Sequence, residues 1–148
     1  MRWIIPAVLA VTIALLAGRL VDLGLFADLS WAEVESIAHQ FEESVFAEGQ
    51  RVLRQGLGGS ALYIVVEGRA AVEVAGRALG RLERGDVFGE ISVLLGEAPS
   101  ADVRAETLLR CLVVPGPTVE QFLLERPAVM LRMLKSEARR LREAGRWR

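Results

Sequence analysis

This 148-residue chain contains near its middle the segment Gly85-Asp86-Val87-Phe88-Gly89-Glu90-Ile91-Ser92, followed by Ala101-Asp102-Val103-Arg104-Ala105. The second segment alternates small apolar residues with charged ones, as a strand with one buried face does. Short apolar runs that stop at glycine lie on both sides of these segments. Strands this short, with glycine turns at about 8–12-residue spacing, indicate an all-β barrel or sandwich. The predicted strands are 44–46, 51–53, 61–67, 70–74, 77–82, 101–105 and 110–114.

Helical periodicity appears before and after these strands. Ser30 is a good N-cap, and Glu33 completes a capping box, so a helix is expected over residues 31–38. Helical spacing returns at 118–124 and 129–141. The last of these helices carries an apolar stripe, which we expect to be buried against the body or a partner. The stripe consists of Met130, Leu134, Ala138 and Leu141.

The order helix, strands, helix, with its motifs, resembles the cyclic-nucleotide-binding domain family. The motifs are 25–29, Phe46-x-Glu48-Gly49, 62–65 ending in Glu67-Gly68, 85–92 and 101–105. The resemblance runs from about Leu20 to Leu141. It implies a mainly β fold with flanking helices: an antiparallel, jelly-roll-like β-barrel of the cyclic-nucleotide-binding type, preceded by a hydrophobic helix.

In this family the segment after Phe-Gly-Glu forms a short helix that captures a cyclic phosphate. The resemblance implies that Gly89 lets the backbone approach the ligand, that Glu90 accepts hydrogen bonds from a ribose hydroxyl, and that Ser100 lies beside the phosphate. The candidate ligand-binding residues, with no catalytic residue and no metal ligand among them, are Phe88, Gly89, Glu90, Ile91, Ser92, Ser100 and Ala101.

The family's phosphate-binding arginine is missing. Pro99 occupies its position, and Asp102 occupies that of a threonine, which adds a negative charge near the expected site. Loss of the cation that pairs with a largely buried phosphate costs about 3–5 kcal/mol. Arg104 is the nearest substitute, but strand alternation points it outward. No cofactor is therefore certain, and a cyclic nucleotide is expected to bind weakly. A retained scaffold, genuine nucleotide sensing and a different small ligand remain the three alternatives.

Composition excludes several functions. The chain has one cysteine, Cys111, and one histidine, His39, which excludes an internal disulfide and a histidine-rich metal centre. No nucleophile accompanies His39, so the chain is not expected to be an enzyme. Residues 126–148 hold eight Lys or Arg and two Asp or Glu, whereas the body is acidic. An acidic body argues against nucleic acid as a partner.

The first residues form a separate hydrophobic segment. Residues 3–17 carry no charge, and extension past Arg19 to Val21 reaches the lower limit of about 17 residues for a bilayer span. A membrane-anchoring helix over 1–21, a cleaved signal peptide and a helix docked on a partner subunit are the three interpretations. Residues 22–148 then form the cyclic-nucleotide-binding-like domain with its C-terminal helix and basic tail.

These observations predict a membrane-tethered regulatory or structural module, anchored through residues 3–21 with the barrel in the cytoplasm. We expect it to act through protein partners, either in a larger membrane complex or as a homo-oligomer formed by the C-terminal helix. The alternative is a genuine sensor of cyclic AMP or cyclic GMP that signals through that helix.

Overall fold

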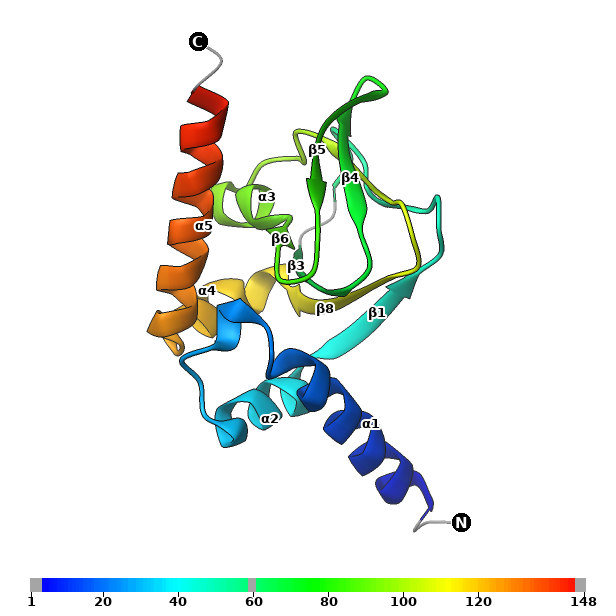
Figure 1. Ribbon diagram of the computed structural model, residues 1–148, viewed down its shortest axis with the longest axis vertical. Coiled ribbons are helices and arrows are strands. Elements are labelled where there is room, and N and C mark those ends of the chain that lie inside the picture. Colours follow the sequence, from blue (N-terminus) through cyan, green and yellow to red (C-terminus); the bar gives the residue numbers. More distant parts are fainter. Residues whose placement is uncertain (1–3, 59–60, 146–148) are drawn as a thin grey trace.

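The computed structural model describes residues 4–58 and 61–145. Its helices stand around a β body, with α1 extending away from it and α5 lying along one side (Figure 1). The helical elements are α1 (Ile4–Leu20), the 3-10 turn η1 (Gly24–Phe26), α2 (Trp31–Gln40), α3 (Glu90–Leu95), α4 (Gly116–Leu124) and α5 (Pro127–Gly145). The strands are β1 (Glu42–Phe46), β2 (Arg51–Leu53), β3 (Ala61–Glu67), β4 (Ala70–Val74), β5 (Arg77–Leu82), β6 (Val87–Phe88), β7 (Asp102–Ala105) and β8 (Leu109–Pro115).

The described strands form two four-stranded antiparallel sheets, ordered β1-β8-β3-β6 and β2-β7-β4-β5. The predicted mainly β fold with flanking helices is confirmed, in a jelly-roll-like arrangement of two packed sheets. The seven strands expected from the sequence all occur. The two-residue strand β6 was not predicted, because its apolar run is too short to show alternation.

Strand β3 lies between two hydrophobic cores. Leu62, Ile64 and Val66 face the helices, where they join buried side chains of α1, α2, α4 and α5. Val65 points to the opposite face and packs between the two sheets with Cys111 of β8. Cys111 is fully buried, and burial raises the pKa of its thiol to about 12, so it serves as a small hydrophobic residue.

Helix α2 begins as its sequence predicts. The Ser30 side chain accepts a hydrogen bond from the backbone of Glu33, and the Glu33 carboxylate accepts one from the backbone of Ser30. This capping box satisfies two backbone N–H groups that a helix start leaves without partners. Val34 and Ile37 then place the apolar face of α2 in the core.

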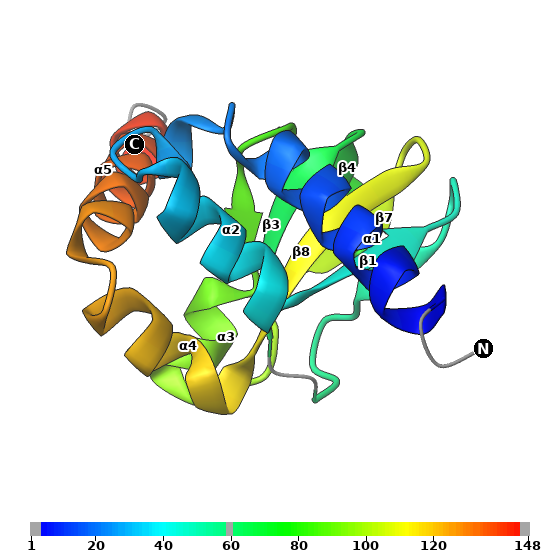
Figure 2. The same ribbon diagram turned by 90° about the horizontal axis from the view of Figure 1, so that it is seen from below.

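The hydrophobic segment at the start of the chain does form a helix, α1, but not a membrane span. Within residues 4–58 and 61–145, no helix has the length and apolar character needed to cross a bilayer. The last turns of α1 instead enter the protein core: Leu16, Ala17 and Leu20 are buried, and α1 runs alongside α2 (Figure 2). The prediction of membrane association is therefore wrong.

The same end of α1 is tied to the β body by charge. Arg19 donates two hydrogen bonds to the Glu43 carboxylate of β1, at 3.0 Å and 2.8 Å, and Arg110 of β8 donates a third at 3.2 Å. The partner of Arg19 is therefore a strand of the same chain.

Helix α5 packs on the body through a different face from the one that carries the predicted stripe. Val129 and Met133 are buried against the body, and Arg140 lies on the same inner side. Leu134 and Leu141 of the predicted stripe are 63% and 75% exposed. The stripe therefore packs against no described part of this chain, whereas Arg140 faces inward.

Candidate functional site

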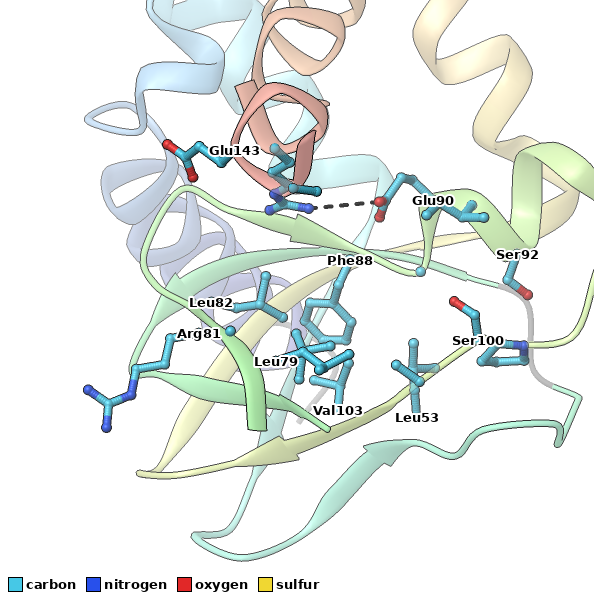
Figure 3. A pocket seen from close by; sticks show the side chains of 18 residues that line it. Leu53, Leu79, Arg81, Leu82, Phe88, Glu90, Ser92, Ser100, Val103 and Glu143 are labelled. Atoms are coloured by element: carbon cyan, nitrogen blue, oxygen red, sulfur yellow. Dashed lines mark ion pairs between the residues drawn. The ribbon is translucent and has the colours of Figure 1, made fainter. Parts of the chain in front are cut away.

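A cavity of about 590 Å³ opens between the sheet of β4 and β5, the helix α3 and the inner face of α5 (Figure 3). All seven residues proposed from the sequence lie in its wall. The structure thus brings together the two segments, 88–92 and 100–101, that the family resemblance pointed to. Their role in binding a ligand stays a prediction.

Gly89 joins β6 to α3 at the edge of this cavity. Its φ of +82° is a conformation that side chains with a Cβ rarely adopt. A Cβ at residue 89 would also collide with the carbonyl oxygen of Ala61. Glycine is thus required here by the backbone itself, and it places the Glu90 side chain in the cavity wall.

The floor of the cavity is apolar. Phe88 stacks on Tyr63 with the rings nearly parallel and their centroids 4.7 Å apart. The burial of Tyr63 raises the pKa of its hydroxyl group. The remaining apolar lining comes from both strands of the β4-β5 hairpin and from β2 and β7: Leu53, Val72, Leu79, Leu82 and Val103.

Glu90 is the buried charge of the site, with only 6% of its surface exposed. Its Oε1 atom lies 3.8 Å from Nη1 of Arg140, the ion pair dashed in Figure 3. Its Oε2 atom is buried, and no described residue donates a hydrogen bond to it, although the carboxyl of Glu90 lies within hydrogen-bonding reach of the Glu137 carboxyl when one of the two is protonated. Burial, followed by the nearby Glu137 carboxylate, raises the pKa of Glu90 to about 7. Glu90 therefore exchanges a proton near neutral pH.

Arg140 was missed as a site residue. Besides Glu90, its guanidinium contacts Glu137 at 3.4 Å and donates a hydrogen bond to the carbonyl oxygen of Val87 at 3.1 Å. One signal was available in the sequence: Arg140 follows Met133 by seven residues, or two helical turns, and so shares its face. That face could not be recognised as the inner one without knowing which stripe of α5 is buried.

The segment that should carry the phosphate-binding arginine offers no cation. Pro99, Ser100 and Ala101 line the cavity, and the Pro99 carbonyl oxygen accepts a hydrogen bond from the backbone of Gly56 at 2.9 Å. Arg104 points outward as predicted and pairs with Glu73 of β4 at 2.6 Å.

Asp102 differs from the expectation. Its carboxylate accepts a hydrogen bond from the backbone N–H of Gln55 at 2.6 Å and lies 3.8 Å from Arg51, and it is not part of the cavity wall. Asp102 therefore holds the segment after β2 in place rather than adding charge to the site.

Two arginines border the cavity, and each has a carboxylate partner. Arg81 of β5 points away from the cavity in Figure 3 and lies 3.3 Å from Glu106. Arg140 is held by Glu90 and Glu137. Within the described residues, no group of three metal-ligating side chains lies close enough together to hold a metal ion.

Residues 43–126 match the family model described as "Cyclic nucleotide-binding domain". The chain belongs to the cyclic nucleotide-binding domain family. This family is a regulatory ligand-binding domain rather than a catalytic one, and the match spans the strands and the α3 cassette that form the cavity.

Individual proteins give the same result. Over 86 residues the chain is 41% identical to a cAMP-dependent protein kinase regulatory subunit of Mycosarcoma maydis. The alignment covers 55% of this chain and 16% of that protein. The crystal structure of the Thermus thermophilus catabolite activator protein superposes with a TM-score of 0.70 at 30% identity, covering 82% of this chain and 59% of that one. The cAMP-bound PfPKA-R (141–441) superposes with a TM-score of 0.75 at 18% identity, covering 93% and 49%, which shows the shared fold.

The chain spans between 12% and 26% of the length of the curated relatives it matches. What those longer proteins do as a whole therefore bears on this cyclic nucleotide-binding domain only as a basis for proposals.

Proposed function

We propose that this chain is a regulatory, non-catalytic cyclic nucleotide-binding domain that binds cyclic AMP and cyclic GMP weakly and acts through a protein partner. The observation that carries the proposal is the double role of α5. Its inner face reaches the cavity through Arg140, and its outer face exposes the apolar stripe. A ligand that shifts α5 through Arg140 would therefore also shift the surface that a partner contacts.

Weak cyclic nucleotide binding is supported by the charges around the cavity. Pro99 replaces the expected arginine, and both bordering arginines already have carboxylate partners. A cyclic phosphate placed here would lose hydration without gaining a free cation from residues 4–58 or 61–145. By analogy with an ion pair that has lost one partner, the cost is about 3–5 kcal/mol. That is roughly two to three and a half powers of ten in affinity.

The proposed partner surface is the outer face of α5. Beside Met130 of the stripe, Leu131 is also exposed, and Leu131, Leu134, Ala138 and Leu141 follow one another at spacings of three, four and three residues. This is the spacing of the contact positions in a two-stranded coiled coil. A second copy of the chain would bury the stripe by packing α5 against its symmetry mate, and a different subunit of a larger complex is the alternative occupant.

The runner-up function is a genuine cyclic nucleotide sensor. It is favoured by the position of Gly89, Glu90 and Ser100 together in one cavity wall, where the family resemblance expects ribose and phosphate contacts. In either case we propose residues 22–148 as the regulatory domain, with the segment before residue 22 as an added helix.

Sedimentation equilibrium tests the partner surface directly. We expect the chain to dimerise and the variant Leu134→Asp to be monomeric, because an aspartate in a dry helix contact is unpaired. Arg139→Ala is the matched control, since it changes the net charge by the same amount at an exposed position outside the stripe. The proposal is contradicted if the wild-type chain is monomeric and no defined partner co-purifies with it. It is also contradicted if the two variants assemble alike.

A further inference from the structure

The second half of α5 is not held to the body by apolar packing. Val129 and Met133 fix the first half in the core, and Arg132 pairs with Asp28 of the loop before α2. From residue 134 to residue 144, every side chain is exposed or half-buried. Burial of apolar surface therefore positions only the beginning of this helix. The remainder must be positioned by contacts of another kind.

Those contacts are polar and come from one cluster. Among the described residues, the hydrogen bonds and ion pairs between 134–144 and other elements all involve Arg140 or Glu137. Arg140 donates a hydrogen bond to the carbonyl oxygen of Val87 at 3.1 Å and lies 3.8 Å from Glu90, the ion pair dashed in Figure 3. The carboxyls of Glu90 and Glu137 share a hydrogen bond when one of them carries a proton.

The charge of this cluster depends on that proton. With both carboxyls ionised, two negative charges meet the single positive charge of Arg140. With one proton shared between them, the cluster is neutral and the two carboxyls attract each other through a hydrogen bond. Glu90 is only 6% exposed, so an unbalanced negative charge at this contact is weakly screened by water. The contact between α3 and α5 is therefore strongest with the proton bound.

The surrounding elements supply no second charge that would replace the proton. The charged groups that act on Glu90 are Glu137 and Arg140, both of α5. Arg81 of β5 pairs with Glu106 and points away, and Glu143 of α5 adds a negative charge at the cavity rim. Three further titratable groups lie on the neighbouring elements β3 and α4. They are Tyr63, whose pKa is raised so that it stays neutral below pH 10, and the exposed Glu120 and Glu125.

We propose that Glu90, Glu137 and Arg140 form a proton-operated latch, which holds the second half of α5 against α3 while the two carboxyls share one proton and releases it when that proton is lost. Arg140, Glu143 and Ala144 line the cavity, so release would also open one side of it. The inference goes beyond the proposed function, because the latch responds to pH with neither a nucleotide nor a partner bound.

The direction of the response follows from the two states of Glu90. In the closed state, burial and then Glu137 raise its pKa from 4.5 to about 7. Release removes Glu137 and exposes the carboxyl, so its pKa falls back toward the ordinary value. The closed contact is therefore fully stable below about pH 4.5, weakens as pH rises to about 7, and changes no further above that. Over this range the ratio of released to closed chains should rise by up to roughly two orders of magnitude.

A distance measured between two spin labels on the full chain, without any ligand, tests the latch. The labels are attached to cysteines introduced by Glu120→Cys on α4 and Arg142→Cys on α5, both at exposed positions. Cys111 is fully buried and stays unlabelled. Labelled protein is mixed with an excess of unlabelled protein, so that only distances within one chain are recorded, and double electron–electron resonance is measured at pH 5 and at pH 8.

We expect one narrow distance distribution at pH 5 and a second, broader one at pH 8, with the ratio of released to closed chains tenfold or more higher at pH 8. Identical distributions at the two pH values would overturn the inference. The sedimentation test of the outer stripe does not depend on this result, so the proposed function and the latch fail separately.

Variants show whether the proton lies in the named cluster. Glu137→Gln replaces the proton-bearing carboxyl by an amide, which donates a hydrogen bond to Glu90 at any pH and leaves one carboxylate for Arg140. This variant should stay closed at both pH values. Glu143→Gln is the matched control: it removes the same charge from the same helix, but Glu143 is exposed and is not among the groups that act on Glu90.

Glu143→Gln should open with pH as the wild type does. If Glu137→Gln opens to the same extent as the wild type, the cluster is not the latch and the inference is wrong. Because Glu137 is 30% exposed, its replacement by an amide of the same size should be tolerated by the fold. Should either variant fail to fold, the pH dependence of the unmodified cluster still decides whether α5 is released.

Discussion

The backbone of Gly89 lies so close to the carbonyl oxygen of Ala61 that no Cβ atom fits between them. A Cβ there would also stand 3.3 Å from Cδ2 of Tyr63, the residue that stacks on Phe88. The close approach fixes the start of α3 against β3. Because α3 carries Glu90, this contact sets the position of the buried carboxylate in the cavity wall.

Substitution of Gly89 by alanine should therefore be strongly destabilising. The positive φ alone costs about 1 kcal/mol, and relief of the collision with rigid backbone adds about 1–3 kcal/mol. We expect a loss of about 2–4 kcal/mol in the free energy of unfolding, measured by urea denaturation. Gly85→Ala is the control, since Gly85 has a φ of +92° but open space around its Cβ position. Equal losses for the two variants would show that the contact with Ala61 is unimportant.

Glu43 should contribute to stability through its contacts with α1 and β8. It accepts charged hydrogen bonds from Arg19 and Arg110, and its side chain is only 13% exposed. Such bonds contribute about 1.5–3 kcal/mol each before solvent screening, and both arginines are about one-third exposed. We expect Glu43→Ala to lower the free energy of unfolding by about 1–3 kcal/mol.

The neighbouring Glu42→Ala is the control, because Glu42 is exposed on the same strand. It should stay within about 0.5 kcal/mol of the wild type in urea denaturation. If Glu43→Ala has no larger effect than Glu42→Ala, α1 is not held to the body by this charge cluster.

Ionisation of Glu90 should make the fold less stable as pH rises. The folded chain raises the pKa of this carboxyl from an ordinary value of 4.5 to about 7. Below pH 4.5 both the folded and the unfolded chain are protonated there, and no cost arises. As pH rises from 4.5 to 7, Glu90 ionises in the unfolded chain but stays protonated in the folded chain. Ionisation therefore stabilises only the unfolded chain over this range. The resulting loss of stability is on the order of 3 kcal/mol and is constant above pH 7.

The measurement is the free energy of unfolding between pH 5 and pH 8 for the wild type and Glu90→Gln. The variant cannot ionise at this position, so its stability relative to the wild type should increase over that range. Effects of titrating groups remote from Glu90 cancel in the difference. A difference that does not change with pH would mean that Glu90 is not the buried titrating group.

Local chemistry predicted most of the fold. Ser30 and Glu33 identify the start of α2 because a capping box depends on residues only three positions apart. The strands could be located because glycine turns interrupt them at regular intervals, and the cassette at 88–92 could be located because its motif is contiguous.

Features that depend on packing between distant segments could not be predicted in this way. The apolar residues of α1 are compatible with lipid or with a protein core, and only the fold shows that Leu16 and Leu20 are buried in the core. The face of α5 that packs on the body could not be identified from the sequence for a similar reason. Leu134 is apolar and exposed, whereas Arg140 is charged and faces the cavity, so hydropathy alone points to the wrong side.

The most direct test of the account is calorimetric titration of two full-length proteins, the wild type and the Pro99→Arg variant, with cyclic AMP and with cyclic GMP. Both nucleotides should bind the wild type with dissociation constants no tighter than about 10 µM, because Pro99 stands in place of the arginine and no described residue offers the phosphate a free cation. Pro99→Arg restores that cation and should strengthen binding tenfold or more. Submicromolar binding to the wild-type chain would contradict the account and would identify the protein as a cyclic nucleotide sensor.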